Sequence, residues 1–181
     1  MRGKTLGLVG WGKIGKKVVD IASKGLGMKV IAYNRHITEN KEEEFGYLTP
    51  NMKELFANAD FISLHLPGSA ATHHMINAEL IGLMKPTAYL INCGRGEVVD
   101  EAALIEALKN HKIQGAALDV VETNLPADDN PLLKMDNVIV TPHTAAFTTE
   151  ALENMAYQAA LGVYETLEGK PVTFPINKLG R

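Results

Sequence analysis

Short apolar runs alternate with helical patterns along the chain, and this alternation predicts a parallel β-sheet. Six runs are interpreted as strands because most of their residues are apolar, as expected for strands that helices cover on both faces. The runs are 5–9, 29–33, 61–64, 88–92, 115–118 and 138–140. Helical patterns follow most of them, at 13–26, 50–58, 77–84 and 101–109. Repeated units of this kind predict an α/β fold, a doubly wound parallel sheet in three α/β/α layers.

Two helix starts and one charged segment carry local signals. Thr49 followed by Pro50 predicts an N-cap and a first helical position, and Asp100 predicts the N-cap of the helix at 101–109. The segment 39–44 reads Glu-Asn-Lys-Glu-Glu-Glu, and we expect a solvated loop or a helix start there.

The last helical pattern has no partner element in the chain. It runs over 149–168 and ends at Gly169-Lys170-Pro171, which is a helix stop. We therefore expect residues 1–149 to form a dinucleotide-binding domain. We expect residues 150–181 to be an exit helix and tail that return to a substrate domain.

Composition is ordinary for a globular protein, with 46% hydrophobic and 22% charged residues among 181. A formal net charge of −3 gives no reason to expect a nucleic acid or an anionic membrane as a partner. The single cysteine, Cys93, excludes an internal disulfide. No apolar stretch has membrane-spanning length and the start lacks a signal-peptide pattern, so we expect a cytoplasmic protein.

A glycine-rich turn joins the first predicted strand to the first predicted helix. Residues 9–15 read Val-Gly-Trp-Gly-Lys-Ile-Gly, which is the spacing of a dinucleotide-binding turn in a Rossmann sheet. Gly10 is expected to allow the tight turn, Gly12 to let a pyrophosphate approach the backbone, and Gly15 to let the helix lie on the sheet. The free N–H groups at the helix start would bind the phosphates.

Ligands of such a sheet bind at the carboxyl ends of its strands, and this rule selects the candidate site. The predicted cofactor-binding residues are Gly10, Gly12, Lys13, Ile14, Gly15, Asn34, Arg35, His36, His65, Pro67, Cys93, Arg95, Asp119 and His143. An arginine binds a carboxylate with a planar fork, and a histidine transfers a proton near neutral pH. Together with a nicotinamide, these groups would suffice to reduce a 2-oxo acid.

The chain resembles the nucleotide-binding domain of the D-isomer-specific 2-hydroxyacid dehydrogenases. The matching stretches are 7–15, "ADFISLHLP" at 59–67, "LMKPTAYLINCGRGEVVDEAALIEAL" at 83–108, "GAALDVVE" at 115–122 and "NPLLKMDNVIVTPHTAAFT" at 130–148. The resemblance implies an NAD- or NADP-dependent oxidoreductase that acts on a 2-hydroxy or 2-oxo acid and forms a homodimer. It also implies that a further part of the substrate domain precedes this chain, so we expect the chain to bind a dinucleotide but to catalyse slowly or not at all.

Three site residues receive roles from this resemblance. Arg95 would hold the substrate carboxylate and carbonyl, His143 would be the general acid/base, and Asp119 would bind the nicotinamide carboxamide. The alternatives are a surface arginine, a structural histidine at a strand end, and an aspartate that caps a turn.

The chain departs from the family at the partner of the histidine. The family places a glutamate five residues after the aspartate, and this chain has Asn124 there. Asn124 can accept a hydrogen bond from His143 but brings no charge, so we expect weaker reduction above neutral pH. In the alternative, a shift of the loop lets Glu122 take this role.

A second departure concerns the choice of cofactor. NAD-specific members carry an acidic residue at the end of the second strand, where this chain reads Asn34-Arg35-His36. Without the carboxylate, Arg35 could bind a 2′-phosphate, which favours NADP or the use of both cofactors.

The remaining candidates receive minor roles. His65 and Pro67 are expected to line the cofactor groove, and Cys93 to be a small strand-end residue. No metal site is predicted, because His73 and His74 are adjacent and would diverge on regular structure. Two rival functions remain open: a corepressor-like module that dimerises with NAD, and a formate-dehydrogenase-like enzyme in which an amide pairs with the histidine.

Overall fold

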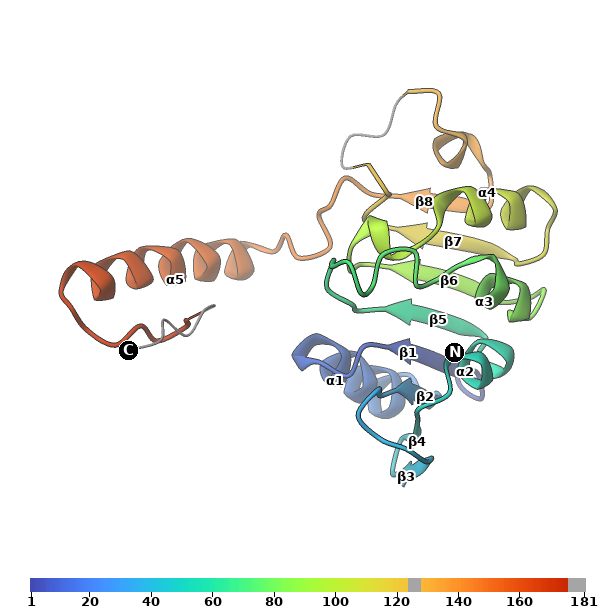
Figure 1. The fold of residues 1–181 in the computed structure, drawn as a ribbon, viewed down its shortest axis with the longest axis horizontal. Helices are drawn as coiled ribbons and strands as arrows, with labels where there is room; N and C mark the ends of the chain where they lie inside the picture. The colour runs from blue at the N-terminus through green and yellow to red at the C-terminus, as the bar shows by residue number, and fades with distance from the viewer. Residues whose placement is uncertain (124–127, 176–181) are drawn as a thin grey trace. The chain divides into compact units, whose positions relative to one another are not determined.

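The computed structural model describes residues 1–123 and 128–175, and Figure 1 shows their fold. Two compact units divide the chain, Met1–His143 and Thr144–Arg181. Asn124, a predicted catalytic residue, lies outside the described residues.

The described part of the first unit is built on a sheet of eight strands in the order β3-β4-β2-β1-β5-β6-β7-β8. Six of them are the predicted strands, and neighbours among them pair in parallel. They are β1 (Thr5–Val9), β2 (Lys29–Tyr33), β5 (Phe61–Leu64), β6 (Tyr89–Asn92), β7 (Gly115–Leu118) and β8 (Val138–Val140). The predicted α/β fold with a doubly wound parallel sheet is confirmed.

Two further strands were not predicted. β4 (Gly46–Thr49) pairs in parallel with β2, and β3 (Lys41–Glu43) pairs antiparallel with β4 at the edge of the sheet. The prediction of a loop or helix start at 39–44 is therefore wrong. An edge strand tolerates charged side chains, which also discourage pairing with another chain, so β3 lacks the apolar pattern of a buried strand.

The helices agree with the predicted segments except at some ends. α1 (Lys13–Asp20) continues as a π-helical turn, η1 (Ile21–Gly25), and the bounds of α2 (Met52–Asn58), α3 (Ala78–Leu83) and α4 (Glu101–Lys109) follow the predictions closely. Two short 3₁₀ turns, η2 (Gly96–Val98) and η3 (Pro131–Lys134), complete the unit's helical segments in the described residues.

One of the two predicted N-caps is correct. The Asp100 side chain accepts a hydrogen bond from the backbone N–H of Ala103 at 3.0 Å, as predicted for the start of α4. The prediction for Thr49 is wrong, because Asn51 caps α2 by accepting from the N–H of Glu54 at 3.2 Å. Thr49 is fully buried at the end of β4, and its hydroxyl donates to the Glu54 carboxylate at 3.1 Å.

The strands bury alternate residues on the two faces of the sheet, which gives three layers. The cluster on one face joins α2, α3 and α4 to the strands and includes Val9, Ile31, Ile62, Leu90, Leu118, Phe56, Ile81 and Leu104. The cluster on the other face includes Leu6, Leu8, Val30 and Ala32 with Val19 of α1. Full burial of each large apolar side chain contributes about 1.5–3 kcal/mol, so both faces hold the strand ends in place.

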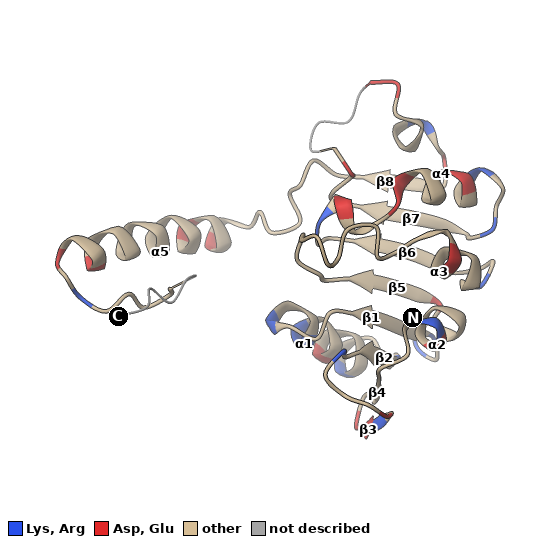
Figure 2. Ribbon diagram, in the orientation of Figure 1, with Lys and Arg blue, Asp and Glu red and all other residues tan. Residues whose placement is uncertain are grey.

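The second unit contains the helix α5 (Thr149–Leu167), which carries glutamates but no lysine or arginine, as Figure 2 shows. The Thr148 hydroxyl caps its start by accepting from the N–H of Ala151 at 3.2 Å. After the helix, the N–H of Thr173 donates to the Glu165 carboxylate at 2.8 Å and ties the following segment to α5. Among the described residues, no helix has the length and apolar character needed to cross a membrane.

Candidate nucleotide-binding and catalytic edge

The carboxyl ends of six parallel strands form one row at the edge of the sheet. Pairing across the sheet aligns the final strand residues Tyr33, Val9, Leu64, Asn92, Leu118 and Val140. The next residues therefore share the following row, with about 4.8 Å between neighbouring strands. This row consists of Asn34, Gly10, His65, Cys93, Asp119 and Thr141. Five of these six are predicted cofactor-binding residues, and the sheet brings them to one edge.

The three glycines of the turn after β1 have different surroundings. Gly10 has a φ of +114°, and a Cβ built there would lie 2.5 Å from the carbonyl oxygen of His65. A Cβ at Gly15 would lie 2.1 Å from the carbonyl oxygen of Gly10. Nothing lies within 4 Å of a Cβ at Gly12. The fold therefore requires glycine at Gly10 and Gly15, whereas the space over Gly12 is open.

The start of α1 is open to an anion. Its N-cap is Gly12, which supplies no side-chain hydrogen bond, whereas Asn51, Asn77 and Asp100 cap α2, α3 and α4. The first turn holds no acidic residue, the side chains of Lys13 and Ile14 are exposed, and Figure 2 shows the basic character of α1. Unsatisfied N–H groups and the positive end of the helix dipole favour a phosphate at such a position.

The segment after β2 is an exposed turn that its own side chains shape. The Asn34 Oδ1 accepts a hydrogen bond from the N–H of His36 at 3.0 Å. The Arg35 Nε donates to the His36 Nε2 at 3.4 Å, and both of these residues are exposed. The turn thus presents a guanidinium, and none of its three residues is acidic.

A buried asparagine shapes the loop that carries Arg95. The Asn92 side chain is 1% exposed; its Nδ2 donates to the carbonyl of Arg95 at 3.1 Å, and its Oδ1 accepts from the N–H of Gly94 at 3.0 Å. A Cβ at Gly96 would lie 1.8 Å from the carbonyl oxygen of Val121, so only glycine fits there. Arg95 itself is exposed. Asn92 was not among the predicted site residues, although an amide at the end of an apolar strand was a usable signal.

The residues at the ends of β6 and β7 are electrostatically coupled. Asp119 is 6% exposed, and its Oδ1 accepts a hydrogen bond from the Thr141 hydroxyl at 2.6 Å. Partial desolvation raises the pKa of the Cys93 thiol, and the negative charge of Asp119 raises it further. Both effects disfavour the thiolate, which is the nucleophilic form of a cysteine.

His65 and Pro67 follow β5. The His65 Nε2 lies 2.9 Å from the Ser63 hydroxyl, and burial lowers the pKa of this imidazole. Pro67 is exposed, and its carbonyl accepts a hydrogen bond from the Thr72 hydroxyl at 2.7 Å. Burial thus disfavours the protonated form of the His65 imidazole. The residue lies beside the glycine turn, because its backbone carbonyl packs against Gly10.

His143 follows β8 in a strained turn. Its φ is +58°, its N–H donates to the carbonyl of Thr141 at 2.9 Å, and the residue is exposed. The Oε1 of Glu122 lies 2.7 Å from the Nε2 of His74, so this carboxylate already has a histidine partner. This contact speaks against the alternative in which Glu122 serves His143.

A doubly wound sheet whose glycine-rich turn leads into an uncapped helix defines the class of dinucleotide-binding α/β domains. A family model described as "D-isomer specific 2-hydroxyacid dehydrogenase, NAD binding domain" matches residues 1–145. The chain belongs to this family, which confirms the resemblance seen in the sequence.

Several curated relatives are similar over nearly the whole chain. The D-3-phosphoglycerate dehydrogenase of Methanocaldococcus jannaschii is 47% identical over 169 residues, which are 93% of this chain and 32% of the relative. The glyoxylate reductase of Thermococcus litoralis is 44% identical over 178 residues, which are 98% of this chain and 53% of the relative. The chain thus spans between 32% and 53% of the length of these two relatives.

Solved structures give the same result. The D-lactate dehydrogenase with NAD⁺ from Lactobacillus jensenii matches with a TM-score of 0.83 at 39% identity, over 97% of this chain and 56% of that chain. An NADPH-dependent glyoxylate/hydroxypyruvate reductase from Sinorhizobium meliloti, in complex with NADP and malonate, matches with a TM-score of 0.87 at 30% identity. This match covers 97% of this chain and 54% of the reductase chain.

Proposed function

We propose that this chain binds a nicotinamide dinucleotide at the strand-end row and serves in the reduction of a 2-oxo acid or the oxidation of a 2-hydroxy acid. The observation that carries the proposal is the open space over Gly12 at the uncapped start of α1. A backbone without a Cβ and a helix start without a side-chain cap are what a pyrophosphate needs for close approach.

The residues further along the row fit the rest of such a ligand. A bound nicotinamide would supply the hydride that a 2-oxo acid takes at C2. The Asp119 carboxylate, held by Thr141, would accept a hydrogen bond from the carboxamide group. Arg95, on the loop that Asn92 shapes, would bind the acid's carboxylate with two parallel N–H···O bonds.

His143 is the proposed proton donor to the substrate oxygen during reduction. It follows β8, which pairs with β7, the strand that Asp119 follows, and its exposed ring is accessible to a substrate. Asn124 would accept a hydrogen bond from the other ring nitrogen and so orient the imidazole, but without a charge to stabilise its protonated form.

We propose NADP, or both cofactors, as the natural ligand. The proposal is supported by the turn after β2, in which Asn34, Arg35 and His36 present a guanidinium and no carboxylate; such a group could bind a ribose 2′-phosphate. The similar structures include an acyclic imino acid reductase in complex with NADPH and a D-lactate dehydrogenase with NAD⁺, so relatives of this fold are found with either cofactor.

The test is direct titration of the chain with NADH and NADPH, followed by a panel of 2-oxo acids. The single tryptophan, Trp11, lies between Gly10 and Gly12, so its fluorescence reports on ligands at the turn. We expect saturable quenching by both nucleotides, with tighter binding of NADPH. Binding without reduction of any 2-oxo acid is the result expected of this chain, which spans 32–53% of the length of two relatives, and it would support the dinucleotide site. The same panel with a protein that also carries the substrate domain separates the oxidoreductase from the rival binding module; no nucleotide binding by the chain would overturn the proposal. A homodimer is likewise proposed and is tested by light scattering.

A further inference from the structure

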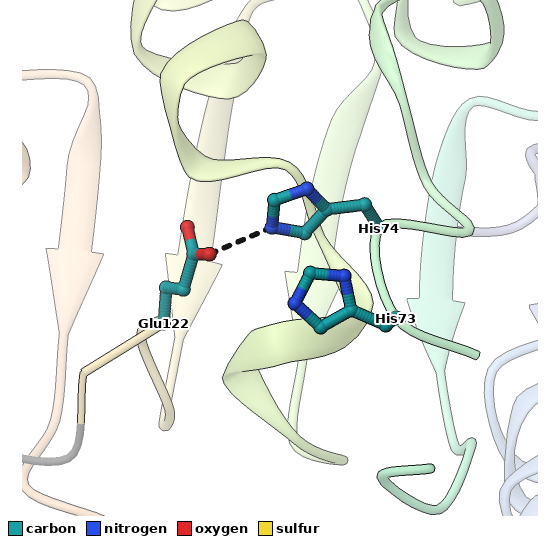
Figure 3. Close-up of side chains that lie close together, drawn as sticks. All are labelled: His73, His74 and Glu122. Carbon is teal, nitrogen blue, oxygen red and sulfur yellow. Dashed lines mark hydrogen bonds and ion pairs between the residues drawn. The ribbon is translucent and has the colours of Figure 1, made fainter. Parts of the chain in front are cut away.

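Two adjacent histidines lie on the loop between β5 and α3 with their rings stacked. The ring centroids of His73 and His74 are 4.0 Å apart and the ring planes differ by 28°, and Figure 3 shows both rings on the same side of the loop. Adjacent side chains diverge on a strand or helix. Here His74 has a φ of +49°, so the premise of regular structure, on which the sequence argued against a shared metal, does not hold.

A carboxylate from a distant part of the chain completes the group. The Oε1 of Glu122, on the segment after β7, lies 2.7 Å from the Nε2 of His74, as the dashed line in Figure 3 marks. One ligand atom from each of His73, His74 and Glu122 lies within 4.8 Å of the other two. Two imidazole nitrogens and one carboxylate oxygen are a ligand set that Zn²⁺ accepts in proteins, with a fourth position left for water.

Backbone hydrogen bonds hold the three residues in position. The N–H of His73 donates to the carbonyl of Ser69 at 2.9 Å, and the N–H of His74 donates to the carbonyl of Glu97 at 2.9 Å. The N–H of Glu122 donates to the Glu101 carboxylate at 2.8 Å. The site is therefore anchored to α4 and to the Arg95 loop, and only side chains need to move when an ion binds.

From this geometry we infer that His73, His74 and Glu122 form a binding site for a divalent transition-metal ion. The expected ion is Zn²⁺. Zinc binds nitrogen and oxygen at about 2.0–2.2 Å, which sets the ligand atoms about 3.3 Å apart in a tetrahedron. Rotation of the exposed His73 ring would bring its ligating nitrogen to this distance from the other two ligand atoms. The His74 and Glu122 side chains are 36% and 34% exposed, so solvent reaches the site.

A bound ion would join the loop after β5 to the segment after β7. Both contact the loop of Arg95: the N–H of His74 donates to the carbonyl of Glu97, and the carbonyl of Val121, after β7, packs against Gly96. Because the ion binds the folded chain through residues 48 positions apart in the sequence, zinc should raise the midpoint of thermal unfolding. The inference does not depend on the proposed function.

The experiment is calorimetric titration of the untagged chain with Zn²⁺, and with Co²⁺ as a spectroscopic probe. We expect one ion per chain and, with Co²⁺, the visible absorption bands of a tetrahedral site. His73→Ala and Glu122→Gln should each weaken zinc binding at least about tenfold, as loss of a ligand costs no less than loss of an outer partner. His74→Asn tests the third ligand with a residue that tolerates a left-handed φ.

His111→Asn is the matched control, because His111 is also exposed and has a φ of +51°. It should leave zinc affinity and the zinc-dependent rise in unfolding temperature unchanged. The inference is overturned if the chain binds no zinc. It is also overturned if His73→Ala and Glu122→Gln keep the affinity of the original chain, since the ion would then sit on other histidines.

Discussion

The buried Asn92 side chain donates a hydrogen bond to the backbone carbonyl of Arg95, 3.1 Å away, and so shapes the loop on which this arginine stands. Asn92→Ala removes this bond and the one that its Oδ1 accepts from the N–H of Gly94, so among the described residues the Arg95 carbonyl keeps only the N–H of Val98, at 3.3 Å. We predict a loss of about 1–3 kcal/mol in the free energy of unfolding, measured by denaturant titration. The control Asn110→Ala removes an exposed amide and should change stability by less than about 0.5 kcal/mol. Equal effects of the two variants would contradict the assignment.

The environment of His65 predicts a pH dependence of stability. Burial lowers the pKa of this group below its ordinary value of 6.5, so the unfolded chain takes up the proton first as the pH falls. His65 therefore contributes full stability above pH 6.5, and this contribution declines as the pH falls from 6.5 toward the pKa in the folded state. His65→Gln should flatten the profile of unfolding temperature between about pH 7 and pH 5. Parallel profiles for both proteins would show that His65 does not carry the effect.

The reactivity of the Cys93 thiol should depend on the negative charge of Asp119. Partial desolvation and the Asp119 charge raise the pKa of the thiol, so alkylation by iodoacetamide at pH 8 should be slow for an exposed cysteine. Asp119→Asn removes the charge that disfavours the thiolate and should speed alkylation. Asp60→Asn is the control, because it removes a carboxylate at the start of β5, and it should leave the rate unchanged. A slower reaction of Asp119→Asn would contradict the coupling.

Arg35 is predicted to distinguish the two cofactors. Arg35→Ala should weaken NADPH binding about tenfold or more, because a charge-assisted hydrogen bond contributes roughly 1.5–3 kcal/mol. The affinity for NADH should change little, and Arg2→Ala, which removes another exposed arginine, should affect neither. A loss that is equal for both nucleotides would show that Arg35 does not bind a 2′-phosphate.

The buried strands were predictable because their sequence signal is local. A run such as 88–92 is apolar wherever the strand is covered, and the glycine spacing fixes the order of strand, turn and helix. β3 gave no such signal: Lys41–Glu43 is charged and pairs with β4 at the sheet edge. The sequence pattern did not predict the π-helical turn either, because this turn depends on a backbone hydrogen bond from the N–H of Leu26 to the carbonyl of Ile21.

The same distinction between local and long-range signals applies to the candidate site. Gly10, Asp119 and the other strand-end residues followed from topology once the strands were assigned. The pairing of Glu122 with His74 did not, because it joins residues 48 positions apart and depends on the left-handed turn at His74. The choice between Thr49 and Asn51 as N-cap was also beyond local rules, since both residue types cap helices well.

The proposed dinucleotide site depends on Gly12, and a bulky side chain at this position separates binding from folding. Gly12 has a φ of −89° and a ψ of −170°, which any residue adopts, and nothing lies within 4 Å of its Cβ position. Gly12→Val should therefore cost no more than about 1 kcal/mol of stability as a poorer N-cap. Gly82→Val, which also adds a side chain into open space, is the control.

The decisive measurement is the dissociation constant of NADPH for the original chain, Gly12→Val and Gly82→Val, followed by Trp11 fluorescence. We predict that Gly12→Val weakens binding at least about tenfold, which is about 1.4 kcal/mol, while its unfolding temperature stays close to that of the control. An unchanged dissociation constant in a folded Gly12→Val protein would contradict the claim that a pyrophosphate binds at the start of α1.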